Sequence, residues 1–170
     1  DSHGGEGIAV LRVLQGPAGY SAWALLKGLE GRDSGFEADP DGDGIANGLE
    51  FALGGEPHPG HPEADSKATL PAIEVEEGDL VFTFHRPKAA RDAVALHFQW
   101  SGDLDFGGAT RTLPILSGYA VYDGVEMEVL ESISRPGMDW IRVVVPREKA
   151  MSARLFGRIR VSPSTDSRGH

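Results

Sequence analysis

Three aspartates stand at alternate positions in ADPDGDGIANGLE, residues 38–50. Carboxylates this close repel one another, and a cation among them would relieve the repulsion. The run follows the spacing D-x-[DN]-x-[DN]-G-x5-E, which supplies a shell of oxygen ligands around a sharp turn at Gly44. The ligands it predicts are the side chains of Asp39, Asp41 and Asp43, the backbone carbonyl of Ile45, and the side chains of Asn47 and Glu50.

The ligand types favour calcium. Calcium takes roughly six to eight oxygen ligands, and a glutamate at the last position can supply two of them. Magnesium prefers a smaller octahedral shell with retained waters, and zinc prefers His or Cys, neither of which occurs in the loop. A solvated acidic turn without an ion is the alternative.

Two short helices are predicted on either side of this loop. The first spans residues 20–31 and presents Ala22, Leu25, Leu26 and Leu29 on one face. The second begins inside the loop and presents Ile45, Leu49, Ala52 and Leu53. Residues 20–56 therefore predict a helix–calcium loop–helix segment, in which the ion connects two helices too short to be stable alone.

From about residue 71 the apolar residues recur with a period of two. The stretches LVFTFHR, VALHFQW, WIRVVVP and RLFGRIRV alternate in this way, and AIEVEE and GVEMEVLES are further strand candidates. Short strands separated by turns rather than helices predict a mainly β fold, an antiparallel β-sandwich over residues 71–162. Residues 57–70 are predicted as a linker and 163–170 as a polar tail.

Composition narrows the classes of function. The chain of 170 residues holds 16 basic and 26 acidic residues, a net charge of −10, which argues against nucleic acid as a partner. No apolar run approaches the roughly 18 residues of a membrane-spanning helix. Cysteine is absent from the sequence, so disulfide and thiolate chemistry are excluded.

The order of these parts resembles C-terminal modules of large secreted bacterial proteins, over residues 20–162. The loop is similar to thrombospondin type-three and dockerin calcium loops. The resemblance implies a secreted, non-catalytic module with calcium ligands at the six positions named above. A paired calcium sensor or a cohesin-binding dockerin is disfavoured, because loop position eight is Ala46 rather than a larger aliphatic residue and no second loop follows.

The sequence contains no catalytic motif of the G-x-S-x-G, H-E-x-x-H or P-loop type. We predict no enzyme activity and no catalytic residue. The leading hypothesis is an extracellular, calcium-binding structural or assembly module whose partners are other copies of itself. A carbohydrate-binding module of a secreted enzyme is the alternative, with a surface polysaccharide stacked on Trp140, Tyr119 and Tyr122, the last two in an expected loop.

The N-terminal residues 1–19 are predicted as a separate extended segment. Within it, GIAVLRVLQG, residues 7–16, is more apolar than a solvent-exposed linker, and its β-branched residues favour a strand. Such a strand needs a sheet edge. It can pair within its own chain, or it can be donated to a neighbouring copy, in which case the protein is the subunit of an extracellular filament.

Overall fold

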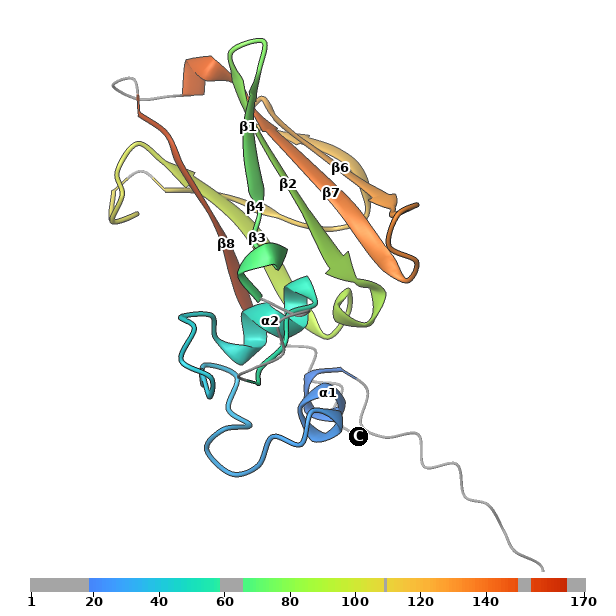
Figure 1. Ribbon diagram of the computed structural model, residues 1–170. Helices are drawn as coiled ribbons and strands as arrows, with labels where there is room; N and C mark the ends of the chain where they lie inside the picture. Colours follow the sequence, from blue (N-terminus) through green and yellow to red (C-terminus); the bar gives the residue numbers. More distant parts are fainter. Residues whose placement is uncertain (1–18, 59–65, 109, 150–153, 165–170) are drawn as a thin grey trace, which may run out of the picture.

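The computed structural model describes residues 19–58, 66–108, 110–149 and 154–164. The strand predicted at residues 7–16 and most of the polar tail lie outside this part. The described residues form two antiparallel sheets, as predicted (Figure 1). Their strands are β1 (Ala72–Glu76), β2 (Asp79–Pro87), β3 (Val94–Ser101), β4 (Arg111–Pro114), β5 (Gly118–Tyr122), β6 (Val125–Glu131), β7 (Met138–Val145) and β8 (Phe156–Pro163).

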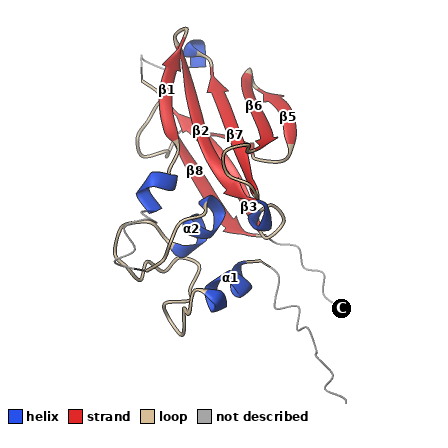
Figure 2. Ribbon diagram, turned by 45° about the vertical axis from the view of Figure 1, so that its right-hand side comes forward, coloured by secondary structure: helices blue, strands red, loops and turns tan. Residues whose placement is uncertain are grey.

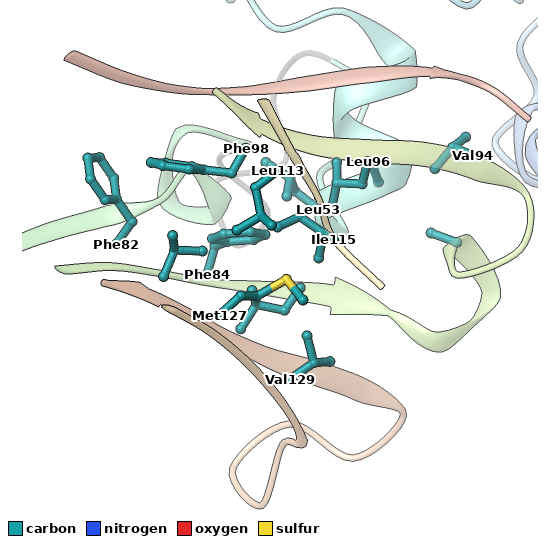
Figure 3. Close-up of a cluster of buried hydrophobic side chains, with 14 of the residues drawn as sticks. Leu53, Phe82, Phe84, Val94, Leu96, Phe98, Leu113, Ile115, Met127 and Val129 are labelled. Carbon is teal, nitrogen blue, oxygen red and sulfur yellow. The ribbon is translucent and has the colours of Figure 1, made fainter. Parts of the chain in front are cut away.

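The larger sheet has the order β1-β2-β7-β6-β5 and the smaller sheet has the order β4-β3-β8. Apolar side chains from the facing sides of both sheets fill the space between them (Figure 3). Phe82 of the larger sheet and Phe98 of the smaller one meet with ring centroids 4.8 Å apart. The apolar residues that recur with a period of two are buried in both β3 and β7, as the alternation predicts: Val94, Leu96 and Phe98, and Ile141, Val143 and Val145.

Two short helices, α1 (Tyr20–Leu26) and α2 (Asn47–Leu53), lie at one end of the sandwich (Figure 2). α2 inserts Phe51, Ala52 and Leu53 into the common core. Truncating Leu53, which is 1% exposed, to alanine would cost about 2–5 kcal/mol. The helical segment is therefore packed into the sandwich rather than attached to it by a free linker.

The predicted apolar face of the first helix was wrong at Leu25 and Leu26, whereas Leu29 is buried but lies beyond the end of the helix. α1 ends at Leu26 because the chain turns at Gly28, whose φ is +70°. Leu25 and Leu26 are 69% and 86% exposed. The side of α1 that packs on the core carries aromatic residues instead, Tyr20 and Trp23.

Two strands were not predicted, β4 and β5. The expected loop SGYAVYDG contains β5, the edge strand next to β6. The residues of β5 are mostly exposed on both faces, so they show no alternation in burial that a sequence pattern could reveal.

The predicted linker 57–70 contains a short 3-10 helix, η1 (Ser66–Thr69), and Ser66 is buried. Two further 3-10 turns are η2 (Lys88–Ala90) and η3 (Arg147–Lys149).

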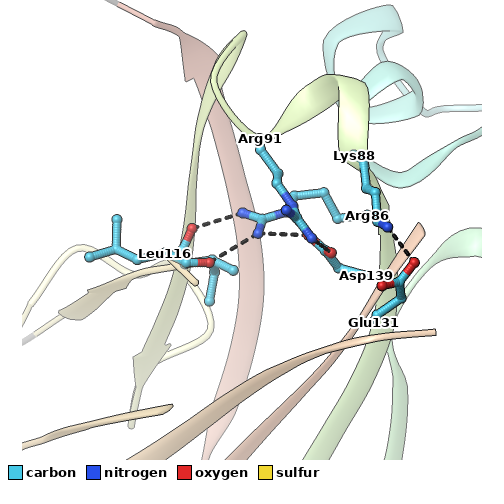
Figure 4. Close-up of polar contacts among 7 residues, drawn as sticks. Arg86, Lys88, Arg91, Leu116, Glu131 and Asp139 are labelled. Carbon is cyan, nitrogen blue, oxygen red and sulfur yellow. Dashed lines mark hydrogen bonds and ion pairs between the residues drawn. The ribbon is translucent and has the colours of Figure 1, made fainter. Parts of the chain in front are cut away.

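A buried ion cluster near η2 ties β2 and β7 of the larger sheet to the segment between β4 and β5 (Figure 4). Arg86 on β2 donates to Asp139 on β7 at 2.8 and 3.0 Å and to the carbonyls of Ile115 and Leu116 at 2.9 and 3.0 Å. Arg91 donates to the same carboxylate. Burial alone would raise the pKa of Asp139, but the hydrogen bonds from the two guanidinium groups outweigh it and hold that pKa below its ordinary value. The single carboxylate of Asp139 is shared by two guanidinium groups, and every partner in the cluster is a protein group, so we regard it as structural.

Candidate metal centre

The three aspartates of the loop converge. One carboxylate oxygen from each of Asp39, Asp41 and Asp43 lies within 4.8 Å of the other two. The loop is folded around its own carboxylates: Asp39 accepts hydrogen bonds from the N–H groups of Gly42 and Gly44 at 2.9 and 3.0 Å, and Asp43 accepts one from Ile45 at 2.8 Å. Gly44 adopts φ +92°, which a residue with a side chain would rarely adopt. The turn predicted at this position is therefore present.

The base of the loop is held against the start of α2. The N–H of Asn47 donates to the carbonyl of Ala38 at 2.8 Å, and the N–H of Gly48 donates to the carbonyl of Phe36 at 2.8 Å. A Cβ at Gly48 would lie 2.3 Å from the Phe36 ring, so only glycine permits this approach. The first turn of α2 is thereby placed beside the loop.

Asn47 is fully buried, and its side-chain orientation is fixed. Its Nδ2 donates to the carbonyl oxygens of Asp33 and Gly35 at 2.7 and 2.9 Å. The opposite orientation would set an oxygen against two carbonyls, so the amide holds Nδ2 toward them and Oδ1 away from them. Oδ1 itself is buried and has no hydrogen-bond donor. It is a free acceptor at the loop position predicted to contribute a ligand.

Glu50, one turn further along α2, is also 0% exposed. Its Oε1 accepts a hydrogen bond from Ser66 of η1 at 2.6 Å, whereas Oε2 is buried without a partner. Burial raises the pKa of Glu50 from its ordinary value of 4.5 to about 7, against the opposing effect of Ser66. The charges of Asp41, Asp43 and Asp39 raise it further, which places Glu50 within electrostatic range of all three.

Two of the predicted ligands, Glu50 and Ile45, are not part of the group of converging carboxylate oxygens. The Glu50 carboxylate is not among the oxygens that lie within 4.8 Å of one another, and its defined contact is with Ser66. Ile45 is buried, with its N–H turned toward Asp43. The structure therefore brings the aspartates together and places Asn47 and Glu50 on the adjoining helix turn.

The described residues provide no cationic side chain that pairs with the carboxylates of this region. Within the residues that the structure describes, no Lys or Arg forms an ion pair with the three aspartates or with Glu50. Burial and the neighbouring carboxylates raise the pKa of Asp41 as well. The available ligand atoms are all oxygens: the carboxylates of the three aspartates and of Glu50, and the amide oxygen of Asn47. Such a set fits a hard divalent cation and does not fit zinc.

Ser66 was missed by the sequence analysis. Its hydroxyl contacts Glu50, accepts from the N–H of Glu56 at 2.8 Å and thus ties η1 to the end of α2. Gly55 leaves room for it, since a Cβ there would lie 2.6 Å from Ser66 Oγ. A metal-binding carboxylate is commonly supported by such a second hydrogen bond. The only sequence signal was a serine in a polar stretch, which is not specific.

The three aromatic residues predicted as a sugar platform do not share one surface. Tyr119 pairs with Glu128, and Trp140 pairs with Leu130, so both side chains point to the outer face of the larger sheet. Tyr122 pairs with the buried Val125 and points to the opposite face, with its ring centroid 6.5 Å from that of Trp100. The predicted platform of three rings was therefore wrong, because Tyr122 does not lie on the face that carries Tyr119 and Trp140.

Trp140 nevertheless lines two hollows on the outer face. One of ≈ 330 Å³ is bordered by Leu130 and Ile133, and one of ≈ 200 Å³ is bordered by His85 and Arg135. His85 is half-buried, and its Nε2 is buried and unpartnered. Desolvation, assisted by the charge of Arg135, lowers the pKa of His85, so its ring is neutral near pH 7.

No family model matches the chain, and neither a curated protein nor a solved structure matches it. The class of the protein is therefore defined by its fold, a mainly β, two-sheet antiparallel sandwich preceded by a short helical segment with an acidic loop. In the described part of the chain, no helix is long and apolar enough to cross a membrane.

Proposed function

We propose that this protein is a non-catalytic, extracellular structural or assembly module that binds one calcium ion at residues 39–50. The observation that carries the proposal is the pairing of three convergent aspartates with two fully buried oxygen acceptors that lack donors, Asn47 Oδ1 and Glu50 Oε2. Burying polar atoms without partners is unfavourable, and a bound cation would satisfy both while neutralising the repulsion of the carboxylates.

The role of the ion follows from where its ligands lie. The aspartates belong to the loop, whereas Asn47 and Glu50 belong to the helix that packs into the core. Ser66 then connects Glu50 to η1, directly before the sandwich begins. Calcium would thus fix the acidic loop to α2 and stabilise the junction between the helical segment and the β-sandwich.

An extracellular location is the natural setting for this site. A single loop without a paired partner binds weakly, and extracellular modules are filled at calcium concentrations of about 10⁻⁴–10⁻³ M. The resemblance to modules of secreted bacterial proteins points the same way. Partners suited to such a module are other copies of the chain or a surface polysaccharide.

The proposal is tested by thermal unfolding with and without calcium at pH 8. Calcium at ten to a hundred times the dissociation constant adds about 1.4–2.7 kcal/mol, a rise of several degrees in melting temperature. Asp41→Asn should lose most of this rise. Glu74→Gln is the matched control, because Glu74 is an exposed carboxylate on β1. An equal response to magnesium and calcium, or a response unchanged in Asp41→Asn, would contradict the proposal.

Carbohydrate binding is the second candidate, favoured by the position of Trp140 between two hollows that offer apolar and polar groups. Trp140→Ala should then weaken retention on insoluble polysaccharide, as should Tyr119→Ala on the same face. Tyr122→Ala is the matched control, since that ring lies on the other face of the sheet. Equal retention of the wild type and Trp140→Ala would remove this candidate.

A further inference from the structure

The sandwich is open along one side, where its two sheets differ in width. β1 is an edge strand of the larger sheet and β8 is an edge strand of the smaller one. β8 lies over β2, because a Cβ at Gly157 would be 2.5 Å from the ring of Phe82. Among the described residues no strand pairs with the free edge of β8, and every residue of β1 is exposed. Both strands lie on the same side of the molecule in Figure 1.

Two apolar side chains face this opening. Ile73 is paired with Phe82, and Val75 is paired with Leu80, so they point to the same side of the sheet as these core residues. Yet Ile73 and Val75 are 60% and 69% exposed. They lie where one more strand of the smaller sheet, added beyond β8, would cover them.

The N-terminal segment enters the described part of the chain at the start of β3, the strand next to β8. A Cβ at Gly19 would be 2.9 Å from the Cβ of Ala93, and the carbonyl of Ala93 accepts from the N–H of Ser164, the residue after β8. Three residue steps, from residue 16 to residue 19, can reach at most roughly 10 Å. That is about two strand spacings, the distance from β3 across β8 to a new edge strand.

We propose that residues 8–15, IAVLRVLQ, form an additional strand on the free edge of β8 in the same chain and cover Ile73 and Val75. The strand runs parallel to β8, because its end leads to Gly19 at the end where β8 also finishes. Its eight residues match the eight of β8.

Pairing within the chain is favoured over donation to another copy. The connection through Pro17 and Ala18 is short, so the segment is held near the β8 edge at an effective concentration that a dilute second copy does not reach. This inference goes beyond the calcium proposal and does not depend on it, since none of the residues involved belongs to the metal centre.

The test measures melting temperature in the full-length chain. If the strand covers the opening, Ile73→Ser and Val75→Ser each remove buried apolar area and lower the melting temperature by about 3–6 °C. Ile133→Ser is the matched control, because Ile133 is 99% exposed and lies outside the opening; it should have almost no effect.

The same substitutions are then made together with Val10→Pro and Leu11→Pro. Two successive prolines remove two neighbouring N–H groups, one of which must face β8 in any register. In this background the effect of Ile73→Ser should vanish, whereas Gly4→Pro with Gly5→Pro, outside the segment, should leave it intact. Measurements in chelator and in calcium should agree, which separates this test from that of the metal site.

Three outcomes would overturn the proposal. Ile73→Ser could behave like Ile133→Ser, which would mean that nothing covers β1. Its effect could persist with the two prolines, which would mean that another segment covers it. Sedimentation velocity could show concentration-dependent assemblies that the prolines abolish, which would assign the strand to a second copy and favour a filament.

Discussion

Replacing Glu50 by glutamine should change the stability of the protein in opposite directions with and without calcium. In chelator at pH 8, Glu50 is a buried carboxylate with a pKa of about 7 instead of 4.5. At 1.36 kcal/mol per pH unit, this difference corresponds to roughly 3 kcal/mol of lost stability. Glutamine is neutral and retains an oxygen to accept from Ser66. Glu50→Gln should therefore raise the melting temperature in chelator, by about 5–10 °C.

The pH dependence gives the sign of this effect. Because the pKa of Glu50 is raised on folding, the native state keeps a proton that the unfolded state releases between pH 4.5 and about 7. The stability of the calcium-free wild type therefore falls as the pH rises through this window and is level above it. The advantage of Glu50→Gln should accordingly disappear at pH 4.5, where both side chains are neutral.

Calcium should reverse the order of the two proteins. The wild type gains stability from the ion, whereas the variant has lost a charged ligand and gains little. Differential scanning calorimetry at pH 4.5 and pH 8, in chelator and in 10 mM calcium (a concentration on the order of ten times the weaker expected dissociation constant), provides the comparison. A variant less stable than the wild type in chelator at both pH values would show that Glu50 is a structural acceptor, and the reasoning would be refuted.

Three further changes test other parts of the account. Ser66→Ala removes the hydrogen bond to Glu50 Oε1 and should reduce calcium affinity about tenfold or more, measured by calorimetric titration; unchanged affinity would show that Ser66 does not support the ligand. Asp139→Asn leaves Arg86 buried without its counter-charge and should cost about 3–5 kcal/mol in urea unfolding; a cost under about 1 kcal/mol would contradict the structural role of this carboxylate. Gly48→Ala forces the Phe36 ring away from α2 and should cost about 1–3 kcal/mol, with a changed near-ultraviolet circular dichroism spectrum; an unaltered spectrum would argue against this contact.

The loop was predictable because its determinants are local. The aspartates, Gly44 and the start of α2 fall within a dozen residues, and their hydrogen bonds join neighbours in the sequence. The core faces of β3 and β7 were predictable for a similar reason, since a period of two in burial is visible whenever one face of a strand is covered. These features required no knowledge of distant contacts.

The errors arose where distant residues decide the outcome. The leucines of α1 fit a helical stripe, but a seven-residue helix is oriented by what it packs on, and here Tyr20 and Trp23 meet Phe51 with ring centroids 5.8 and 5.7 Å apart. Ser66 approaches Glu50 from 16 residues away. β5 is an exposed edge strand, so its residues do not alternate between buried and exposed, and its sequence shows no corresponding pattern.

The central claim is that residues 39–50 hold one calcium ion. Isothermal titration of calcium into the full-length, chelator-treated protein at pH 8 tests it most directly. We expect binding of one ion per chain with a dissociation constant on the order of 10⁻⁴ M, and loss of most of the heat in Asp41→Asn but not in Glu74→Gln. A natively folded protein that takes up no calcium, or that binds it equally well with Asp41→Asn, would contradict the claim.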